Sequence, residues 1–155
     1  MKILLAIPGA RERQLFLDTL ASSGIPPSDL RIASSGESAL EAVRTEAPVL
    51  IVAEWELPGA PGYRLVQGLK KIPGGRDVAV LYCLGAAQRA GAVPPPVWRI
   101  LDFLDRPVSA EAFRQKFRTL EGRIETQKIQ DRSRTLLSAA PAPKSNLPFF
   151  FQAPS

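Results

Sequence analysis

A carboxylate stands at the end of an apolar run in the stretch VLIVAEWELPGAPG, residues 49–62. Five apolar residues lead to Glu54, and a turn rich in proline and glycine follows it. A carboxylate in such a place can accept a transferred group, help to hold a metal ion, or pair with a cation. Which of these it does depends on the residues that the fold brings beside it.

The composition excludes several kinds of chemistry. The chain has no histidine, which removes histidine acid–base catalysis, histidine metal ligands and phosphohistidine. Its one cysteine, Cys83, excludes an intramolecular disulfide and indicates a cytoplasmic location. We find no nucleophile–base pair for hydrolysis, so we expect no enzyme activity. We also expect no metal and no cofactor.

The charge and hydropathy of the chain restrict its partners. The net charge of +5 is spread along the sequence without a basic block, so nucleic acid is not the expected partner. No run of about 18 apolar residues exists, so we expect no membrane span.

Short apolar segments alternate with helical patterns over the first two thirds of the chain. Strands are predicted at residues 2–7, 30–34, 49–53, 78–84 and 99–104. One of the intervening helices begins with a predicted capping box, Ser34 with Glu37. The alternation predicts an α/β fold, a flavodoxin-like doubly wound sheet of five parallel strands with helices on both faces. In such sheets the functional crevice lies at the carboxyl ends of the strands, which puts Glu54 at its rim.

The sequence divides into three parts. Residues 1–120 form the predicted α/β domain, residues 121–138 extend its last helix, and residues 139–155 are a Pro/Ala-rich tail. The extension is either a fraying polar helix or one that binds a second copy or a partner. The aromatic cluster of the tail, Phe149, Phe150 and Phe151, is either part of a flexible end or a peptide that docks.

Three motifs in this order resemble the response-regulator receiver domain, the phosphate-accepting module of bacterial two-component signalling. ASSGESALEAV is similar to the start of that family's second helix, and ELPGAPGYRLVQGLK resembles the segment after its phosphorylated aspartate. FLDRPVSAEAF resembles its Lys-Pro motif and final helix start. The resemblance covers about residues 1–120. It implies a phosphorelay fold in which an aspartate, a magnesium ion and a lysine support phosphoryl transfer.

At the metal and acceptor positions this chain departs from the pattern. The acidic pair of the family falls at Ile7 and Pro8, which cannot ligate a hard cation. The acceptor position holds Glu54, one methylene longer than aspartate. A second acid in the turn, Glu56, would not rebuild the site alone.

At the remaining positions the chemistry is also altered. The hydroxyl position falls on Leu84, the lysine position on Arg106, and the aromatic switch position on Phe103. We therefore interpret the chain as a degenerate, phosphorylation-independent pseudo-receiver that acts as a signalling or scaffold module. Two alternatives stay open: a phosphorylatable receiver with an atypical acceptor, and a flavodoxin-like domain that binds a nucleotide or flavin.

Two hypotheses concern Glu54 and the partner surface. Glu54 either reaches Arg106 and imitates the phosphorylated state, or is a solvated acid at the rim. The expected partner is a protein. It can be a second copy of this chain, in a homodimer formed through the C-terminal helix or through the altered face of the fourth helix and fifth strand. Three prolines, Pro94–Pro96, prevent a full fourth helix there. Trp55 and Trp98 are candidate contacts, with core packing as the alternative for Trp98.

Overall fold

The computed structural model describes residues 1–91 and 98–139 of the chain. The three prolines at 94–96 and the phenylalanines at 149–151 lie outside the described residues, so the predictions made for them stay predictions.

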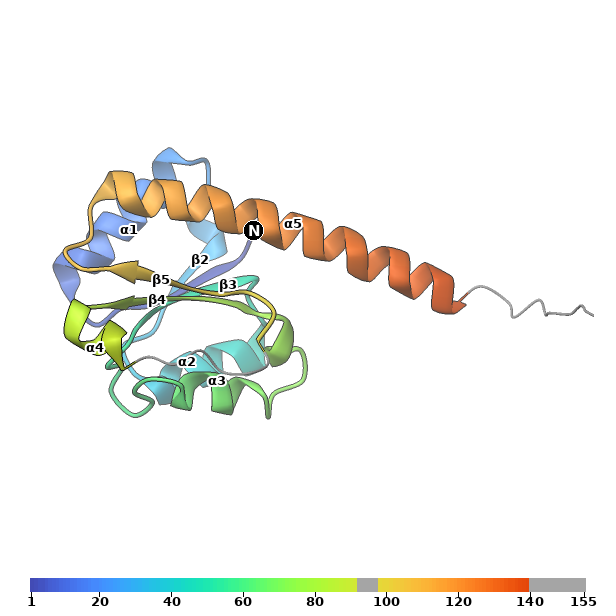
Figure 1. The fold of residues 1–155 in the computed structure, drawn as a ribbon, viewed down its shortest axis with the longest axis horizontal. Helices are drawn as coiled ribbons and strands as arrows, with labels where there is room; N and C mark the ends of the chain where they lie inside the picture. Colours follow the sequence, from blue (N-terminus) through green and yellow to red (C-terminus); the bar gives the residue numbers. More distant parts are fainter. Residues whose placement is uncertain (92–97, 140–155) are drawn as a thin grey trace, which may run out of the picture. The chain divides into compact units, whose positions relative to one another are not determined.

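The five predicted strands form one parallel sheet in the order β2-β1-β3-β4-β5 (Figure 1). This confirms the flavodoxin-like doubly wound fold. The three inner strands, β1, β3 and β4, are buried and largely apolar because helices cover both faces of the sheet, whereas the edge strands β2 and β5 are partly exposed. Their bounds are β1 Ile3–Ala6, β2 Leu30–Ile32, β3 Leu50–Glu54, β4 Ala79–Leu84 and β5 Leu101–Asp105.

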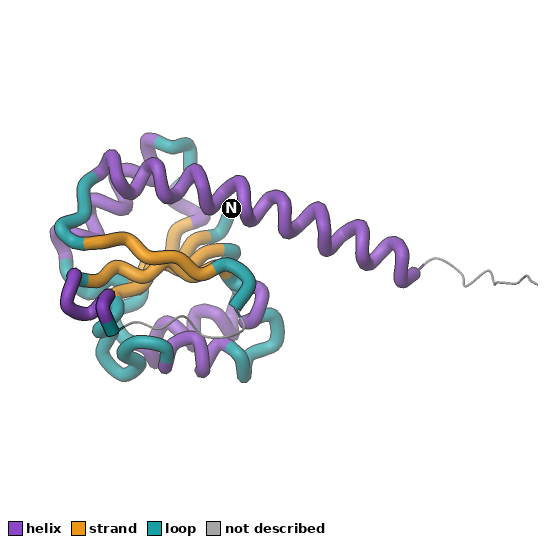
Figure 2. The backbone as a smooth tube through the Cα atoms, viewed as in Figure 1, coloured by secondary structure: helices purple, strands orange, loops and turns teal. Residues whose placement is uncertain are grey.

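Helices lie on both sides of this sheet, with α1 and the first part of α5, up to residue 121, on one face and α2 and α3 on the other (Figures 1 and 2). On the first face, the rings of Phe16 and Phe113 meet edge to face with centroids 4.6 Å apart. The helix bounds are α1 Ala10–Ser22, α2 Gly36–Thr45, α3 Arg64–Leu69, α4 Ala86–Ala90 and α5 Ala110–Ala139, with short 3₁₀ turns η1 Pro27–Asp29 and η2 Gly75–Asp77.

The start of α2 corrects one detail of the prediction. The N-cap is Ser35, one residue later than Ser34, and its hydroxyl accepts a hydrogen bond from the Ser38 backbone N–H. The Ser38 hydroxyl in turn accepts from the Ser35 N–H, so serine replaces the expected Glu37 in the capping box. The shorter serine suffices because its hydroxyl already reaches the N-cap backbone, at 3.1 Å.

The chain separates into two compact units, Met1–Glu121 and Gly122–Ser155. Within α5, Phe113, Phe117 and Leu120 are almost fully buried, as their spacing predicts, and Ile124 is buried too. Ile129 and Leu136 are 54% and 66% exposed.

In the part of the chain that the structure describes, no helix has the length and apolar character needed to cross a membrane.

Candidate functional site

Glu54 and Arg106 meet at the carboxyl edge of the sheet. Glu54 is the last residue of β3, and Arg106 directly follows β5. The Arg106 Nη1 donates to Glu54 Oε2 at 3.2 Å, and its Nη2 forms a second hydrogen bond with Glu54 Oε1. The same Oε2 also accepts from the Glu56 backbone N–H at 2.9 Å. The carboxylate is therefore held by three donors, and it is not a solvated rim acid.

A second carboxylate, Glu12, completes the site. Glu12 lies in the first turn of α1. Its Oε2 accepts from Arg106 Nε at 3.0 Å and its Oε1 from Arg106 Nη2 at 2.7 Å. Arg106 thus makes a two-pronged contact with each acid. We call these three residues, Glu12, Arg106 and Glu54, the arginine clamp.

The contact between Glu54 and Arg106 is one of the two alternatives that the sequence offered, but Glu12 was not predicted, because it belongs to none of the receiver motifs. One signal was present: the helix that follows β1 begins at the same edge of the sheet where β3 ends. An acid in the first turn of that helix can therefore reach the crevice.

The clamp is partly buried, and this sets its electrostatics. The side chains of Glu12, Glu54 and Arg106 are 20%, 18% and 28% exposed. Hydrogen bonds from the guanidinium to Glu12, and then to Glu54, raise the pKa of Arg106 above its ordinary value, although burial opposes the shift. The guanidinium therefore stays charged, and the three groups together carry one net negative charge.

The residues beside the clamp do not fit a magnesium ion. Ile7 is fully buried, and the backbone carbonyls of Ile7 and Pro8 accept hydrogen bonds from Arg13 Nη1 at 3.1 and 3.3 Å. A second guanidinium thus lies where a receiver would place two acids. Both carboxylates of the clamp are already bound to Arg106. Among the described residues there is no group of three or more acidic, cysteine or histidine side chains that could hold a metal ion.

The position expected to carry a hydroxyl has no polar group. Leu84 ends β4 and is fully buried, and its backbone carbonyl accepts from the Arg106 N–H at 2.9 Å. Its neighbour Cys83 is also buried, and this burial raises the pKa of the Cys83 thiol. A protonated thiol is a poor nucleophile.

Aromatic rings fill the space on the α3 side of the crevice. Trp55 contacts Tyr63 and Tyr82 edge to face, with centroids 4.9 and 5.0 Å apart, and Tyr82 stacks on Phe103 at 6.2 Å. The Tyr82 hydroxyl donates to the Gly62 carbonyl at 2.9 Å. Trp55 is therefore half-buried in a ring cluster, and only part of it is left for a partner.

Phe103 is fixed in an inward position. It is 9% exposed, and the Arg89 guanidinium lies 4.7 Å from its ring centroid. Arg89 also pairs with Asp105 at 2.8 Å. A cation over the face of an aromatic ring is attracted to it, so this contact favours the inward position of the residue at the switch position.

Trp98 is the second tryptophan predicted as a partner contact, and the face of β5 is the other predicted partner surface. Trp98 packs against the core, and its Nε1–H donates to the Val78 carbonyl at 3.0 Å, which fits the packing alternative.

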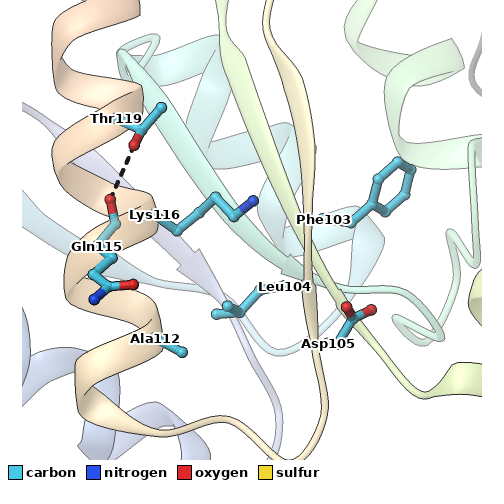
Figure 3. A pocket seen from close by; sticks show the side chains of 7 residues that line it. All are labelled: Phe103, Leu104, Asp105, Ala112, Gln115, Lys116 and Thr119. Carbon is cyan, nitrogen blue, oxygen red and sulfur yellow. Dashed lines mark hydrogen bonds between the residues drawn. The ribbon is translucent and has the colours of Figure 1, made fainter.

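Between β5 and α5 lies a groove of about 390 Å³ (Figure 3). Lys116 extends across it toward β5, where its ammonium pairs with Asp102 at 3.3 Å. The groove is lined by Phe103, Leu104, Asp105, Ala112, Gln115, Lys116 and Thr119.

Comparison with known proteins finds similar folds among solved structures. No family model matches the chain, and no curated protein matches it. Among solved structures, NtrX from Brucella abortus is 25% identical, with a TM-score of 0.63, over 87% of this chain and 29% of the NtrX chain. The present chain thus spans less than a third of NtrX.

Two other solved structures are matched over nearly their whole length. The receiver domain of a sensor histidine kinase from Pseudomonas aeruginosa, with a magnesium ion coordinated in its active-site cleft, is 18% identical; the match covers 80% of this chain and 97% of that one, with a TM-score of 0.63. A two-component transcriptional regulator from Clostridium phytofermentans is 15% identical over 84% of this chain and 98% of its own, with a TM-score of 0.68. The chain therefore has the fold of a receiver domain.

Proposed function

We propose that this protein is a phosphorylation-independent receiver module that acts in signalling by binding another protein. The observation that carries the proposal is the arginine clamp. Arg106 follows β5 as the phosphate-pairing lysine of a receiver does, but here two carboxylates already satisfy it. Because two carboxylates already neutralise the guanidinium charge, a phosphoryl group is not required as its counter-ion.

The clamp takes over the structural task that phosphorylation performs in a receiver. In a receiver, a phosphoryl group on the β3 acid would draw the cation after β5 toward it. Here the Glu54 carboxylate makes that contact permanently, with Glu12 as a second anchor. The fixed ring of Phe103 supports the same conclusion, since the switch residue already lies inward. The module would therefore present one constant surface.

The residues at the metal position support the proposal. The Pseudomonas receiver domain has magnesium in its cleft, whereas Ile7, Pro8 and Arg13 offer no anionic oxygen at the corresponding place. Phosphoryl transfer in this fold depends on a metal to neutralise the phosphate oxygens. Without one, Glu54 is a structural acid.

The partner surface we propose is the groove between β5 and α5. It combines a partly apolar floor, formed by Leu104 and Ala112, with the charged side chains of Asp105 and Lys116. A protein partner of mixed apolar and charged character fits such a groove.

Whether the protein can be phosphorylated is tested by measuring its intact mass. The protein is incubated with acetyl phosphate and magnesium, and its intact mass is measured beside a phosphorylatable receiver domain as the positive control. We expect the control to gain a phosphate and this protein to keep its mass. A stoichiometric phosphate adduct on the wild-type chain would overturn the proposal, and its loss in Glu54→Gln would identify the acceptor.

A further inference from the structure

A second hollow lies at the opposite edge of the sheet from the arginine clamp. It encloses about 420 Å³ and is lined by Lys70, Arg76, Asp77, Trp98 and Arg99. These residues come from the end of α3, from η2, and from the segment before β5. Because they precede β4 and β5 in a parallel sheet, the hollow is at the amino ends of those strands, away from the crevice that holds Glu54.

Unpaired positive charge gathers around this hollow. Arg99 pairs with the one acid of the lining, Asp77, at 3.6 Å. In the described part of the chain, the side chains of Lys70, Lys71 and Arg76 make neither an ion pair nor a hydrogen bond, and all three are exposed. Lys71 lines an adjoining hollow of about 400 Å³ that shares Lys70, Arg76 and Asp77 with the first.

An aromatic surface stands beside these cations. Trp98 is half-buried, and the hydrogen bond from its Nε1–H to the Val78 carbonyl holds the indole in place. Its donor is therefore already used, and what it offers to the hollow is apolar ring surface. A fixed indole next to free ammonium and guanidinium groups combines the two elements that recognise a nucleotide: a stacking surface for the base and cations for the phosphates.

We propose that this hollow and the adjoining one, which together form the basic pocket of Lys70, Lys71, Arg76 and Trp98, bind a nucleoside polyphosphate. The phosphates meet the three cations, and the base lies against Trp98. The volume of the pocket is in the range of small-ligand sites. This proposal does not rest on the function proposed for the module, because the pocket shares no residue with the arginine clamp or with the β5–α5 groove.

The test uses Trp98 as the reporter. The chain has two tryptophans, so Trp55→Phe leaves Trp98 alone. This variant is titrated at low ionic strength with ATP and with GTP, and separately with adenosine and with inorganic triphosphate. We expect saturable quenching with at least one nucleoside triphosphate, and weaker binding of adenosine and of triphosphate alone. Calorimetry on the wild-type chain provides the same constants if Trp55→Phe does not fold.

Charge reversal identifies the pocket. Lys70→Glu with Arg76→Glu is expected to weaken nucleotide binding by about tenfold or more, since phosphate contacts with these two cations are replaced by repulsion. Arg118→Glu, an exposed arginine on α5, is the matched control and should bind within about twofold of the wild type. The proposal is overturned if neither triphosphate binds, if the reversed pair binds as the wild type does, or if adenosine or inorganic triphosphate binds as tightly as the nucleotide.

Discussion

Replacing Arg106 by methionine should lower the free energy of unfolding by about 2–3 kcal/mol, because it leaves two partly buried carboxylates without their cation. Arg106 makes four hydrogen bonds with Glu12 and Glu54, and these two acids are only 20% and 18% exposed. Most of the cost is the repulsion and the poor solvation of the acids that remain. Urea unfolding followed by circular dichroism measures it.

The control for this prediction removes the charges instead of the cation alone. In Glu12→Gln/Glu54→Gln/Arg106→Met the three groups are neutral, so the triple variant should recover most of the stability that Arg106→Met loses. A single Arg106→Met variant that unfolds at the wild-type urea concentration would show that the clamp contributes nothing. A triple variant that is less stable than the single one would show that the acids do not repel each other.

Phe113→Ala is expected to cost more, about 3–5 kcal/mol, as large aromatic truncations in a packed core do. Phe113 is fully buried and its ring meets Phe16 of α1 at 4.6 Å between centroids. Its removal leaves a cavity between α5 and the rest of the first unit, which neighbouring side chains fill only in part. Denaturant unfolding at neutral pH gives the difference.

Ile129→Ala is the matched control on the same helix. Ile129 is 54% exposed, so its truncation should change stability by no more than about 0.5 kcal/mol. The pair of variants distinguishes the packed start of α5 from its continuation. Equal losses at Phe113 and Ile129 would contradict the exposed position of the Ile129 side chain.

The fold was predictable because its signals are local and repeated. The buried strands are short apolar runs such as residues 49–53, and the helices between them end shortly before residues that stop helices, Gly24 and Pro48. The boundaries are less predictable, since they depend on which donor reaches which backbone group. The α2 capping box is the example: Ser34 and Glu37 fit the pattern, but Ser35 and Ser38 have the right geometry.

The candidate site was predictable only in part. The positions of Glu54, Leu84 and Arg106 follow from motif spacing along parallel strands, which meet at one edge of the sheet. The role of Glu12 depends on how α1 starts over that edge, and the one signal for it is an acid in the first turn of the helix that follows β1. The basic pocket was missed for a similar reason, because Arg99 and Trp98 join Lys70 and Arg76 only after the chain has returned through β4.

The most direct test of the account concerns the state of the Arg106 side chain in solution. In a nitrogen-15 labelled sample, the arginine Nε–H resonance that disappears in Arg106→Lys identifies this group, and its exchange with water is measured beside that of the exposed Arg11. The account predicts that the Arg106 Nε–H, which donates to Glu12 at 3.0 Å, exchanges far more slowly than that of Arg11. It also predicts that the resonance shifts in Glu12→Gln and stays in place when magnesium and acetyl phosphate are added. Exchange as fast as that of Arg11, or a shift on addition of magnesium and acetyl phosphate, would contradict a clamp that is permanently closed.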